Sequence, residues 1–438
     1  MNATATLWSA LALALTALSI SRPSWAVALY FLTFFAAPEF WWWGRDLPDL
    51  RYALIAGGVL FVSSSLHSGA SENRRIAPAH WAAVAMAVNA TFVHFFLAVQ
   101  PNSSLRVYAE LLKFLLLFVL MTMAIRDRRD FRMVITAMAL GTAYIGFEIM
   151  VNQRGAFKAG RLEGVGAPGA NTANSLANLM LVVLPLVGGL LVASPAWQKL
   201  VAVVSAPLTL NVILLCNSRG AFLGLFAAAG AFPLLARGRT RKRALQTLGL
   251  GVVVLYLMLG DPRILERFTS TFAGSEERDQ SAASRLQFWQ AGFAMLQDYP
   301  LGAGGGAFKF AVGGRYLREL AGIDEERSLH NGYLAEATSW GIQGLALQLT
   351  LLGSALFGAY RAAAWGRAAG DPDAALVGIC VVVAGVSLLV HSMFGTFLGN
   401  EWCYWVAALL VRYADLYGGP ISNGAGAAPL PHPQAAGS

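Results

Sequence analysis

The feature that most constrains this chain is a long series of apolar runs, each close to the length needed to cross a bilayer. A membrane-spanning helix needs about 20 predominantly apolar residues, and thirteen candidate runs occur in the 438 residues. The runs lie at 7–21, 24–43, 51–68, 80–100, 105–125, 131–151, 173–193, 198–216, 219–236, 244–260, 331–360, 374–398 and 402–416. The first two are short and are separated by Ser21-Arg22-Pro23, so together they can form one broken element. We therefore expect about 12 transmembrane helices, within a range of 11 to 13.

Composition predicts an all-α polytopic membrane protein. Only 13% of the residues are charged and 56% are hydrophobic, whereas soluble domains carry about 25% charged residues. We expect a single transmembrane domain over residues 1–417 and a disordered tail rich in Gly, Pro and Ala at 418–438. The net charge of +8 is explained by cytoplasmic arginine and by anionic lipid or phosphate rather than by a nucleic-acid partner. Cys216, Cys380 and Cys403 lack CxxC spacing, so neither disulfides nor a zinc site is expected.

The distribution of positive charge predicts how the spans are oriented. Cytoplasmic loops carry an excess of Lys and Arg. One alternating set of short loops holds sixteen of these residues and the opposite set holds seven, so the first set is expected to be cytoplasmic. The large loop 261–329 then falls on the other side, which in a Gram-negative cell is the periplasm. We expect a multi-pass protein of the inner membrane whose active site faces the periplasm.

The large loop spans 69 residues. Loops of this length are usually functional or disordered, and this one has the features of an ordered segment. Ser284 is a suitable N-cap for an amphipathic helix that Pro300 would stop. The apolar residues of that helix recur at helical spacing: Leu286, Trp289, Phe293 and Leu296. The glycine-rich run 302–306 lies outside any strand–helix unit, so it predicts a flexible turn rather than a dinucleotide site.

Three side chains are the leading candidates for catalysis: His330, Arg219 and Arg285. His330 precedes an apolar helix, where the helix dipole disfavours imidazolium and leaves the ring able to accept a proton. Arg219 stands beside hydrocarbon, where arginine is costly and commonly functional, and guanidinium suits phosphate oxygens. The alternatives are an interfacial histidine bonded to a loop, an arginine that reaches lipid headgroups and, for Arg285, a solvated helix arginine.

Further polar groups are candidates for substrate binding. Arg154, Lys158 and Arg161 can each steer an anionic substrate or bind lipid. Glu336 is an intramembrane carboxylate, which we expect to form a structural ion pair with an arginine or to orient the site. His391 is interpreted as a bundle histidine with satisfied hydrogen bonds.

No metal site and no cofactor are expected. The acidic run at 324–326 is followed by Arg327, which is typical of a solvated charge run. Asp371-Pro372 is typical of a helix N-cap followed by proline at the first helical position. The face that carries His330 therefore has no obvious acidic metal-binding motif.

Four motifs occur in order over residues 210–350. They are Asn217-Ser218-Arg219-Gly220 opening a span, Ser284-Arg285 before an aromatic helix, Asp298-Tyr299-Pro300-Leu301-Gly302, and His330-Asn331-Gly332-Tyr333-Leu334 with Gly341 and Gly344 downstream. In these motifs the chain resembles the O-antigen ligase/polymerase superfamily. That superfamily includes O-antigen ligases, O-antigen polymerases and bacterial protein O-oligosaccharyltransferases. Elsewhere only hydropathy and topology agree with it.

The resemblance implies a GT-C-type glycosyltransferase that uses a glycan linked to undecaprenyl pyrophosphate. The clear His-Asn motif and the length favour the O-antigen ligase, which joins O-antigen to lipid A–core oligosaccharide. Carried over residue by residue, Arg219 and Arg285 would bind the donor pyrophosphate, and His330 would act as the general base of a metal-independent, inverting displacement. Asn331 and Arg161 are further candidates for substrate contact.

Two kinds of alternative stay open. Within the superfamily, the chain can be an O-antigen polymerase or a protein O-oligosaccharyltransferase. A different class is a transporter of lipid-linked sugar, which short or broken spans and intramembrane charge would suit. The long ordered loop and the absence of a duplicated half argue against a transporter, and a purely structural scaffold gives no reason for arginines and a histidine to share one face.

Overall fold

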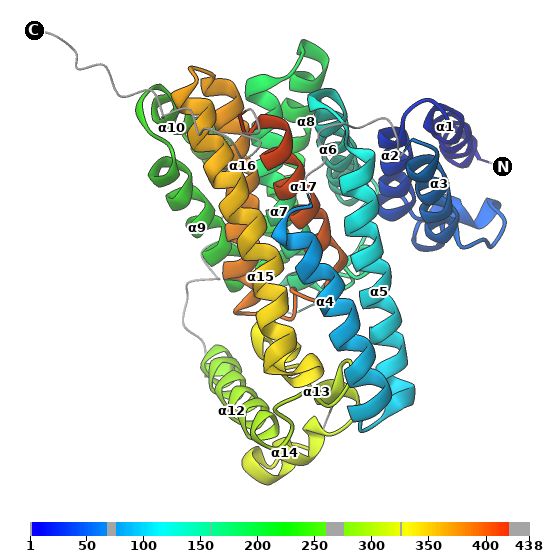
Figure 1. Cartoon of the computed structure of the whole chain (residues 1–438), viewed down its shortest axis with the longest axis vertical. Coiled ribbons are helices and arrows are strands. Elements are labelled where there is room, and N and C mark those ends of the chain that lie inside the picture. The colour runs from blue at the N-terminus through cyan, green and yellow to red at the C-terminus, as the bar shows by residue number, and fades with distance from the viewer. Residues whose placement is uncertain (1, 68–75, 159, 260–275, 325, 420–438) are drawn as a thin grey trace, which may run out of the picture.

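The computed structural model describes residues 2–67, 76–158, 160–259, 276–324 and 326–419. Within these residues the protein is a multi-pass bundle of α-helices with one short β-hairpin (Figure 1). The predicted fold class, an all-α polytopic membrane protein, is thus confirmed apart from that hairpin. The predicted disorder of the tail concerns residues that lie, from 420 onward, outside the described ranges.

The described residues before the hairpin form six α-helices. These are α1 (Ala3–Ser19), α2 (Pro23–Phe35), α3 (Tyr52–Leu66), α4 (Pro78–Phe92) with a π-helical extension (Val93–Leu97), α5 (Pro101–Ala124) and α6 (Arg128–Val151). The hairpin pairs β1 (Ala156–Lys158) antiparallel with β2 (Arg161–Glu163). The described helices that follow are α7 (Ala173–Ala193), α8 (Ala196–Cys216), α9 (Arg219–Leu235), α10 (Gly238–Leu259), α12 (Glu276–Asp298), α13 (Ala307–Phe310), α14 (Gly313–Ala321), α15 (Gly332–Ala368), α16 (Pro372–Ser392) and α17 (Glu401–Tyr417).

Seven helices in the described part of the chain are long and apolar enough to cross a membrane. They are α4 with its extension, α5, α6, α7, α8, α15 and α16. Three further apolar helices, α1, α3 and α9, are shorter. Length and composition thus support a multi-pass membrane protein, while about 12 spans and a GT-C architecture stay predictions.

The prediction of one continuous span over 24–43 is wrong. α2 ends at Phe35 and is followed by two 3₁₀ turns, Pro38–Phe40 and Trp42–Asp46. Pro38 has no N–H with which to continue a helix, and the indole of Trp41 donates to the carbonyl oxygen of Phe35 at 3.2 Å, which satisfies one helix-end acceptor. α1 and α2 are also separate helices that pack against each other (Figure 1).

The centre of the bundle is formed by α16 and α17, whose side chains are nearly all buried. α16 packs against α7, α9, α15 and α17. Asp371 is the N-cap of α16 and Pro372 is its first residue, as the sequence predicts. The hydroxyl of Tyr413 on α17 donates to the carbonyl oxygen of Ala374 at 2.8 Å, so a polar group within the bundle is satisfied internally.

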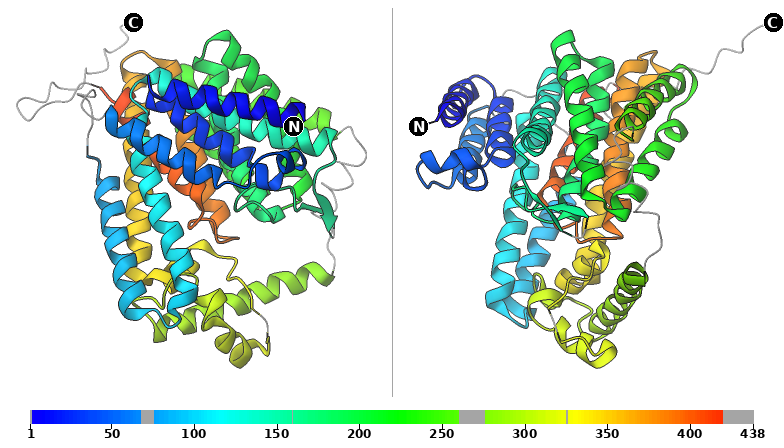
Figure 2. Two further views of the ribbon diagram at one scale, coloured as in Figure 1. Left: turned by 90° about the vertical axis from the view of Figure 1, so that its right-hand side faces the viewer. Right: turned by 180° about the vertical axis from the view of Figure 1, so that it is seen from behind.

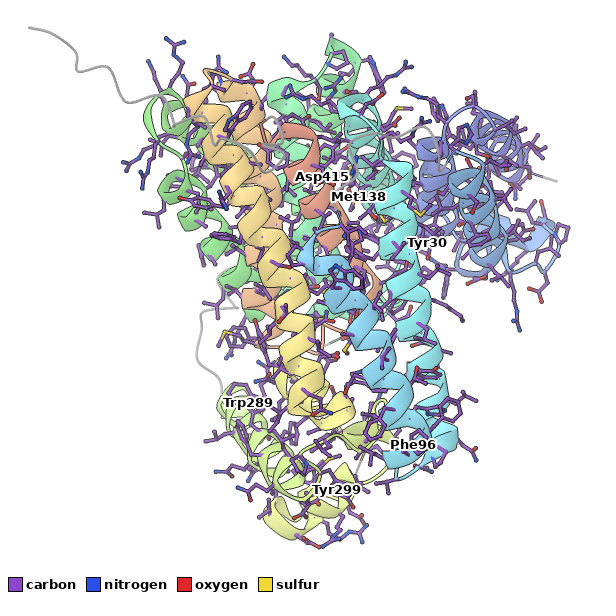
Figure 3. The ribbon with its side chains drawn as sticks, viewed as in Figure 1. Tyr30, Phe96, Met138, Trp289, Tyr299 and Asp415 are labelled. Carbon is purple, nitrogen blue, oxygen red and sulfur yellow. The ribbon has the colours of Figure 1, made fainter. Side chains whose placement is uncertain are left out.

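The described part of the large loop forms a helical layer at one end of the bundle, where α12 and α13 contact α15 and α14 packs against both of them (Figures 1 and 2). Trp289 and Tyr299 mark this layer in Figure 3. The layer has a small core of its own, made of Phe288, Ala291, Met295, Ala303, Ala307, Phe308, Tyr316, Leu317, Leu329 and Leu334. The expected order of the loop therefore agrees with residues 276–324, whereas 261–275 lie outside the described ranges.

One predicted detail of α12 is wrong. The helix begins at Glu276, so Ser284 lies in its interior rather than at its N-cap. The upstream sequence EERDQ supplies good helix formers and acidic residues that suit a first turn. Leu286 and Phe293 are each 57% exposed, whereas Phe288 and Met295 belong to the buried face. The apolar residues of α12 lie on two faces of the helix, one exposed and one buried. Helical spacing alone does not show which apolar residues are on the buried face.

Candidate active site

The start of α15 is a short helix whose C-terminal end is hydrogen-bonded to the large loop. α15 is interrupted at Gly341, whose φ of 82° and ψ of 170° are non-helical. The glycine-rich run docks on this break, because the N–H groups of Ala303 and Gly304 each donate at 3.1 Å to the carbonyl oxygens of Thr338 and Ser339. The prediction of a flexible turn is therefore wrong. The acceptors that fix the run come from a helix end more than thirty residues away, which a local pattern does not reveal.

His330 immediately precedes this short helix and is held by its neighbours. Its φ of 49° lies in the left-handed region that residues other than glycine rarely adopt. Asn331 is the N-cap of α15, and its side chain accepts from a first-turn N–H at 3.1 Å. On the other side, the indole of Trp289 donates to the carbonyl oxygen of Leu329 at 3.1 Å, and the Phe288 ring lies 6.2 Å from the imidazole. Helix α12 and the cap thus fix the backbone that carries the imidazole, and the oxygen of Asn331 is already used.

The His330 imidazole is neutral at neutral pH. Burial, and then the positive charges of Arg285, Arg161 and Arg327, lower its pKa to about 4. Within the described residues neither ring nitrogen has a hydrogen-bond partner. The neutral ring agrees with the expectation from the sequence, but burial and arginine charge account for it rather than the helix dipole alone.

Arg219 is presented at the junction of α8 and α9. Asn217 ends α8 in the left-handed conformation, with φ 46°, and Ser218 is the N-cap of α9. Arg219 is the first residue of α9 and is exposed. A positive side chain at a helix N-terminus opposes the helix dipole, so its position favours an anion-binding role over a stabilising one.

The β-hairpin joins Arg161 to that junction. One guanidinium nitrogen of Arg161 on β2 donates to Oδ1 of Asn174 at 2.5 Å, and Nε donates to the carbonyl oxygen of Cys216 at 3.4 Å. The hydroxyl of Ser218 donates to the same Oδ1 of Asn174 at 2.8 Å. One amide oxygen at the start of α7 therefore connects Arg161 with the segment that carries Arg219.

The arginine motif (residues 217–220) and the histidine motif (residues 330–334) both pack against the connection between α16 and α17. A Cβ at Gly220 would lie 2.8 Å from Cβ of Phe394, and a Cβ at Gly332 would lie 3.1 Å from the carbonyl oxygen of Gly395. A side chain at Gly220 would force its neighbour to shift, and one at Gly332 would require its neighbour to move by a few tenths of an ångström. The two motifs, more than a hundred residues apart in the sequence, are thereby brought to adjacent positions.

Arg161, Arg219 and Arg285 form a positive cluster, of which Arg161 and Arg285 act on His330. Burial, followed by the charges of Arg161 and Arg219, lowers the pKa of Arg285. None of the three arginines pairs with a carboxylate in the described part of the chain. Like charges without counter-ions repel one another, and a bound anion with several oxygens relieves that repulsion through charge-assisted hydrogen bonds.

Arg154 is placed differently from these three arginines. Its guanidinium donates to the carbonyl oxygens of Phe40 and Val165 and lies 5.8 Å from the ring centroid of Trp41. It thus ties the 3₁₀ turns after α2 to the segment after the hairpin. These contacts favour a structural role over the substrate contact expected from the sequence.

Glu336 lies in the first part of α15 and is buried, with 7% of its surface exposed. Among the described residues it forms no ion pair, and its Oε2 has no hydrogen-bond partner. The expected ion pair with an arginine is therefore not formed there. The position of Gly399 faces the other oxygen, since a Cβ at Gly399 would lie 2.8 Å from Oε1.

His391, interpreted from the sequence as an ordinary bundle histidine, lies next to the arginine motif. A Cβ at Gly220 would lie 2.9 Å from its Cδ2 and 3.1 Å from its Nε2. The glycine that follows Arg219 was the available signal, because a glycine in a first helical turn can mark close packing. The sequence around His391 does not indicate that it packs against Gly220.

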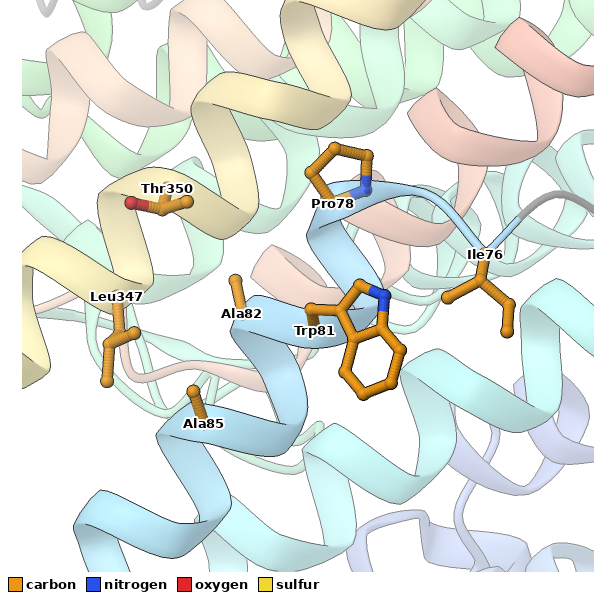
Figure 4. Close-up of a pocket in the computed structure, with 7 residues that line it drawn as sticks. All are labelled: Ile76, Pro78, Trp81, Ala82, Ala85, Leu347 and Thr350. Carbon is orange, nitrogen blue, oxygen red and sulfur yellow. The ribbon is translucent and has the colours of Figure 1, made fainter. Parts of the chain in front are cut away.

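An apolar groove of about 390 Å³ lies elsewhere, between α4 and α15 (Figure 4). It is lined by Ile76, Pro78, Trp81, Ala82, Ala85, Leu347 and Thr350. None of the arginines or histidines described above lines it. The candidate active site is therefore defined by the arrangement of its charged and titratable groups rather than by this groove.

The fold and the site define a multi-pass membrane protein with an arginine cluster that acts on a neutral histidine, an arrangement suited to an anionic substrate and proton transfer. Residues 204–349 match the family model described as O-antigen ligase, which supports a relation of this region to the O-antigen ligase/polymerase superfamily. Residues 5–186 match a family of unknown function (DUF5935). A comparison with curated proteins found no match.

Proposed function

We propose that this chain transfers O-antigen polysaccharide from undecaprenyl pyrophosphate to lipid A–core oligosaccharide at the periplasmic face of a Gram-negative inner membrane. The observation that carries the proposal is the cluster of Arg161, Arg219 and Arg285, which has no carboxylate partners in the described part of the chain and acts through Arg161 and Arg285 on the neutral His330. The O-antigen ligase match over 204–349 supports a lipid-linked glycan as the substrate.

The arginines would bind the donor through its leaving group. The anomeric carbon of the donor already carries pyrophosphate, which is a good leaving group. The donor therefore needs no chemical activation, but the negative charge on the departing pyrophosphate needs stabilisation. Arg219 and Arg285 would hold phosphate oxygens through planar forks, and Arg161 would add a third positive group. Donors aimed at charge that develops in the transition state are commonly the largest contribution to catalysis. We propose that no metal takes part.

His330 would serve as the general base. The oxygen of the acceptor hydroxyl attacks the anomeric carbon as His330 accepts its proton. The bond from that carbon to the phosphate oxygen breaks, and undecaprenyl pyrophosphate leaves with the bonding electrons. A single displacement inverts the anomeric configuration.

Donor binding would also make His330 a better base. Burial is the largest cause of the low pKa of the ring, and the charges of Arg285 and Arg161 lower it further. A bound pyrophosphate offsets those charges, so the pKa of His330 would rise toward its ordinary value in the donor complex. Proton transfer is most effective when the pKa of the base lies near the working pH. The base would thus be weak until the donor is in place.

The domain organisation is part of the proposal. Residues 1–417 would form one transmembrane domain, with the periplasmic loop 261–329 carrying Arg285 to the site. The contacts of α12 with α15 support this arrangement. In this arrangement the site would be complete only when the loop is folded.

A lipopolysaccharide gel from a deletion strain tests the acceptor. The strain is complemented with wild type or with His330→Ala, and the pool of lipid-linked glycan is measured in parallel. The proposal predicts that surface chains vanish, that full-length lipid-linked chains accumulate, and that only wild type restores transfer.

The same gel separates the related functions. If single repeats still reach the core and only the ladder is lost, the chain is a polymerase and the proposed acceptor is wrong. Glycan transfer by the purified protein excludes the transporter alternative, because a transporter moves its lipid without making a glycosidic bond.

A further inference from the structure

His391 lies at the end of α16 with one ring nitrogen engaged and the other free. Its side chain is buried, with 1% of its surface exposed. Its Nδ1 lies 2.9 Å from the amide nitrogen of Asn178, and the oxygen of the same amide accepts from the indole of Trp402 at 2.5 Å. Among the described residues, Nε2 has no hydrogen-bond partner.

These contacts fix the tautomer of the ring. An indole N–H can only donate, so the Asn178 oxygen is the acceptor for Trp402 and the Asn178 NH₂ group faces His391. Because that NH₂ group donates, Nδ1 of His391 must accept. A neutral ring then carries its proton on Nε2. His391 therefore presents a free N–H donor rather than a second base.

The free donor points to the start of α9. Cβ bonds in a helix tilt toward the N-terminus, and the Cβ position of Gly220 lies 3.1 Å from Nε2 of His391. The donor edge of the ring is therefore beside the first turn that carries Arg219. Arg285 is also within electrostatic range of this ring. The Phe397 ring, at 4.5 Å between centroids, covers it and limits access of water.

We propose that His391 is a further substrate-binding residue of the site, whose Nε2–H donates a hydrogen bond to a phosphate oxygen of the donor pyrophosphate held by Arg219. This inference rests on the proposed function. Nε2–H has no acceptor among the described residues, and a phosphate oxygen at the start of α9 would supply one. Helix N-terminal N–H groups favour an anion at the same place. A neutral donor also adds specificity without adding to the repulsion among the arginines.

A binding measurement with full-length protein in nanodiscs tests the inference, with undecaprenyl pyrophosphate as the probe. His391→Phe keeps the ring shape and removes the donor. Because hydrogen bonds to charged groups are strong, we expect affinity to fall about tenfold or more. His80→Phe is the matched control, since His80 is a half-buried histidine that contacts Thr122 rather than the site. Thermal unfolding of each variant reports whether it is folded.

Asn178→Asp changes the pH dependence of probe binding if His391 donates to the probe. A purely structural role of His391 would not produce that change. A carboxylate at 178 can accept from both Trp402 and Nδ1–H of His391, which reverses the tautomer. The ring then offers an Nε2 donor only when it is protonated. Relative to wild type, affinity for the probe should fall as pH rises through the pKa of the ring. Arg285 is the charged group that acts on this ring among the described residues, and it is the same in both proteins.

The outcomes separate the two proposals. If wild type does not bind undecaprenyl pyrophosphate, the proposed function fails. If wild type binds and folded His391→Phe binds equally well, His391 is not a ligand and this inference alone is overturned. If His391→Phe does not fold, Asn178→Asp decides, because a pH dependence parallel to that of wild type also overturns the inference.

Discussion

The indole of Trp289 donates a hydrogen bond to the carbonyl oxygen of Leu329 at 3.1 Å. This bond joins α12, which carries Arg285 one turn earlier, to the residue that precedes His330. The bond thereby fixes the positions of Arg285 and His330 relative to each other, although the two residues come from separate motifs. The bond gives α12 a role in the site beyond that of a surface helix.

Trp289→Phe should lower turnover while leaving the protein folded. The ring still packs in the small core of the loop, but the backbone before His330 loses its donor. A neutral hydrogen bond contributes about 0.5–1.5 kcal/mol, so we expect a loss of roughly two- to tenfold in kcat. Steady-state transfer rates measure it. Trp197→Phe is the control, because Trp197 is 53% exposed on α8; equal rates for the two variants would remove the positioning role.

Arg219→Lys should weaken donor use even though the charge is kept. An ammonium cannot reproduce the planar fork of a guanidinium, so we expect kcat/KM for the lipid-linked donor to fall about tenfold or more. Arg106→Lys is the matched control, since Arg106 is exposed and pairs with Glu110 at 3.1 Å. Full activity of Arg219→Lys would argue against bidentate binding of phosphate.

The pH dependence should differ between the free enzyme and the donor complex. His330 must be unprotonated to act as a base, so activity is lost as pH falls through its pKa. For kcat/KM, which reports the free enzyme, the acid limb should lie near the His330 pKa of about 4. For kcat, the limb should lie at higher pH, because bound pyrophosphate offsets the arginine charges. Coincident acid limbs, measured with purified protein, would contradict that coupling.

Chelation should leave transfer unchanged. The proposed mechanism assigns the charge of the leaving group to Arg161, Arg219 and Arg285, so no divalent ion is needed to stabilise it. Transfer is measured with and without EDTA. Loss of activity with EDTA, followed by recovery with a divalent ion, would show that a metal takes part.

Local patterns in the sequence identified Arg219 and His330 as candidates because each stands where polar and apolar sequence meet. The conditions that bring them together are not local. Gly220 and Gly332 both pack against the connection between α16 and α17, and neither neighbour can be read from the motif itself. Arg161 is similar, since the oxygens of Asn174 and Cys216 that accept its hydrogen bonds come from two other elements, α7 and α8.

The wrong predictions have both local and non-local causes. Ser284 has the chemistry of an N-cap, but favourable helix formers continue upstream to Glu276. The glycine-rich run has the composition of a flexible turn, yet the broken end of α15 supplies its hydrogen-bond acceptors. The prediction that the hydrogen bonds of His391 are satisfied fails because its sequence context does not reveal that Asn178 contacts only one ring nitrogen.

The most direct test of the account is glycan transfer by purified protein with a lipid-linked O-antigen donor and a lipid A–core acceptor, comparing wild type with His330→Ala. A positioned base contributes about 10²–10⁴-fold, so the variant should lose transfer by that factor while binding undecaprenyl pyrophosphate as wild type does. Near-wild-type transfer by a folded His330→Ala protein would contradict the account.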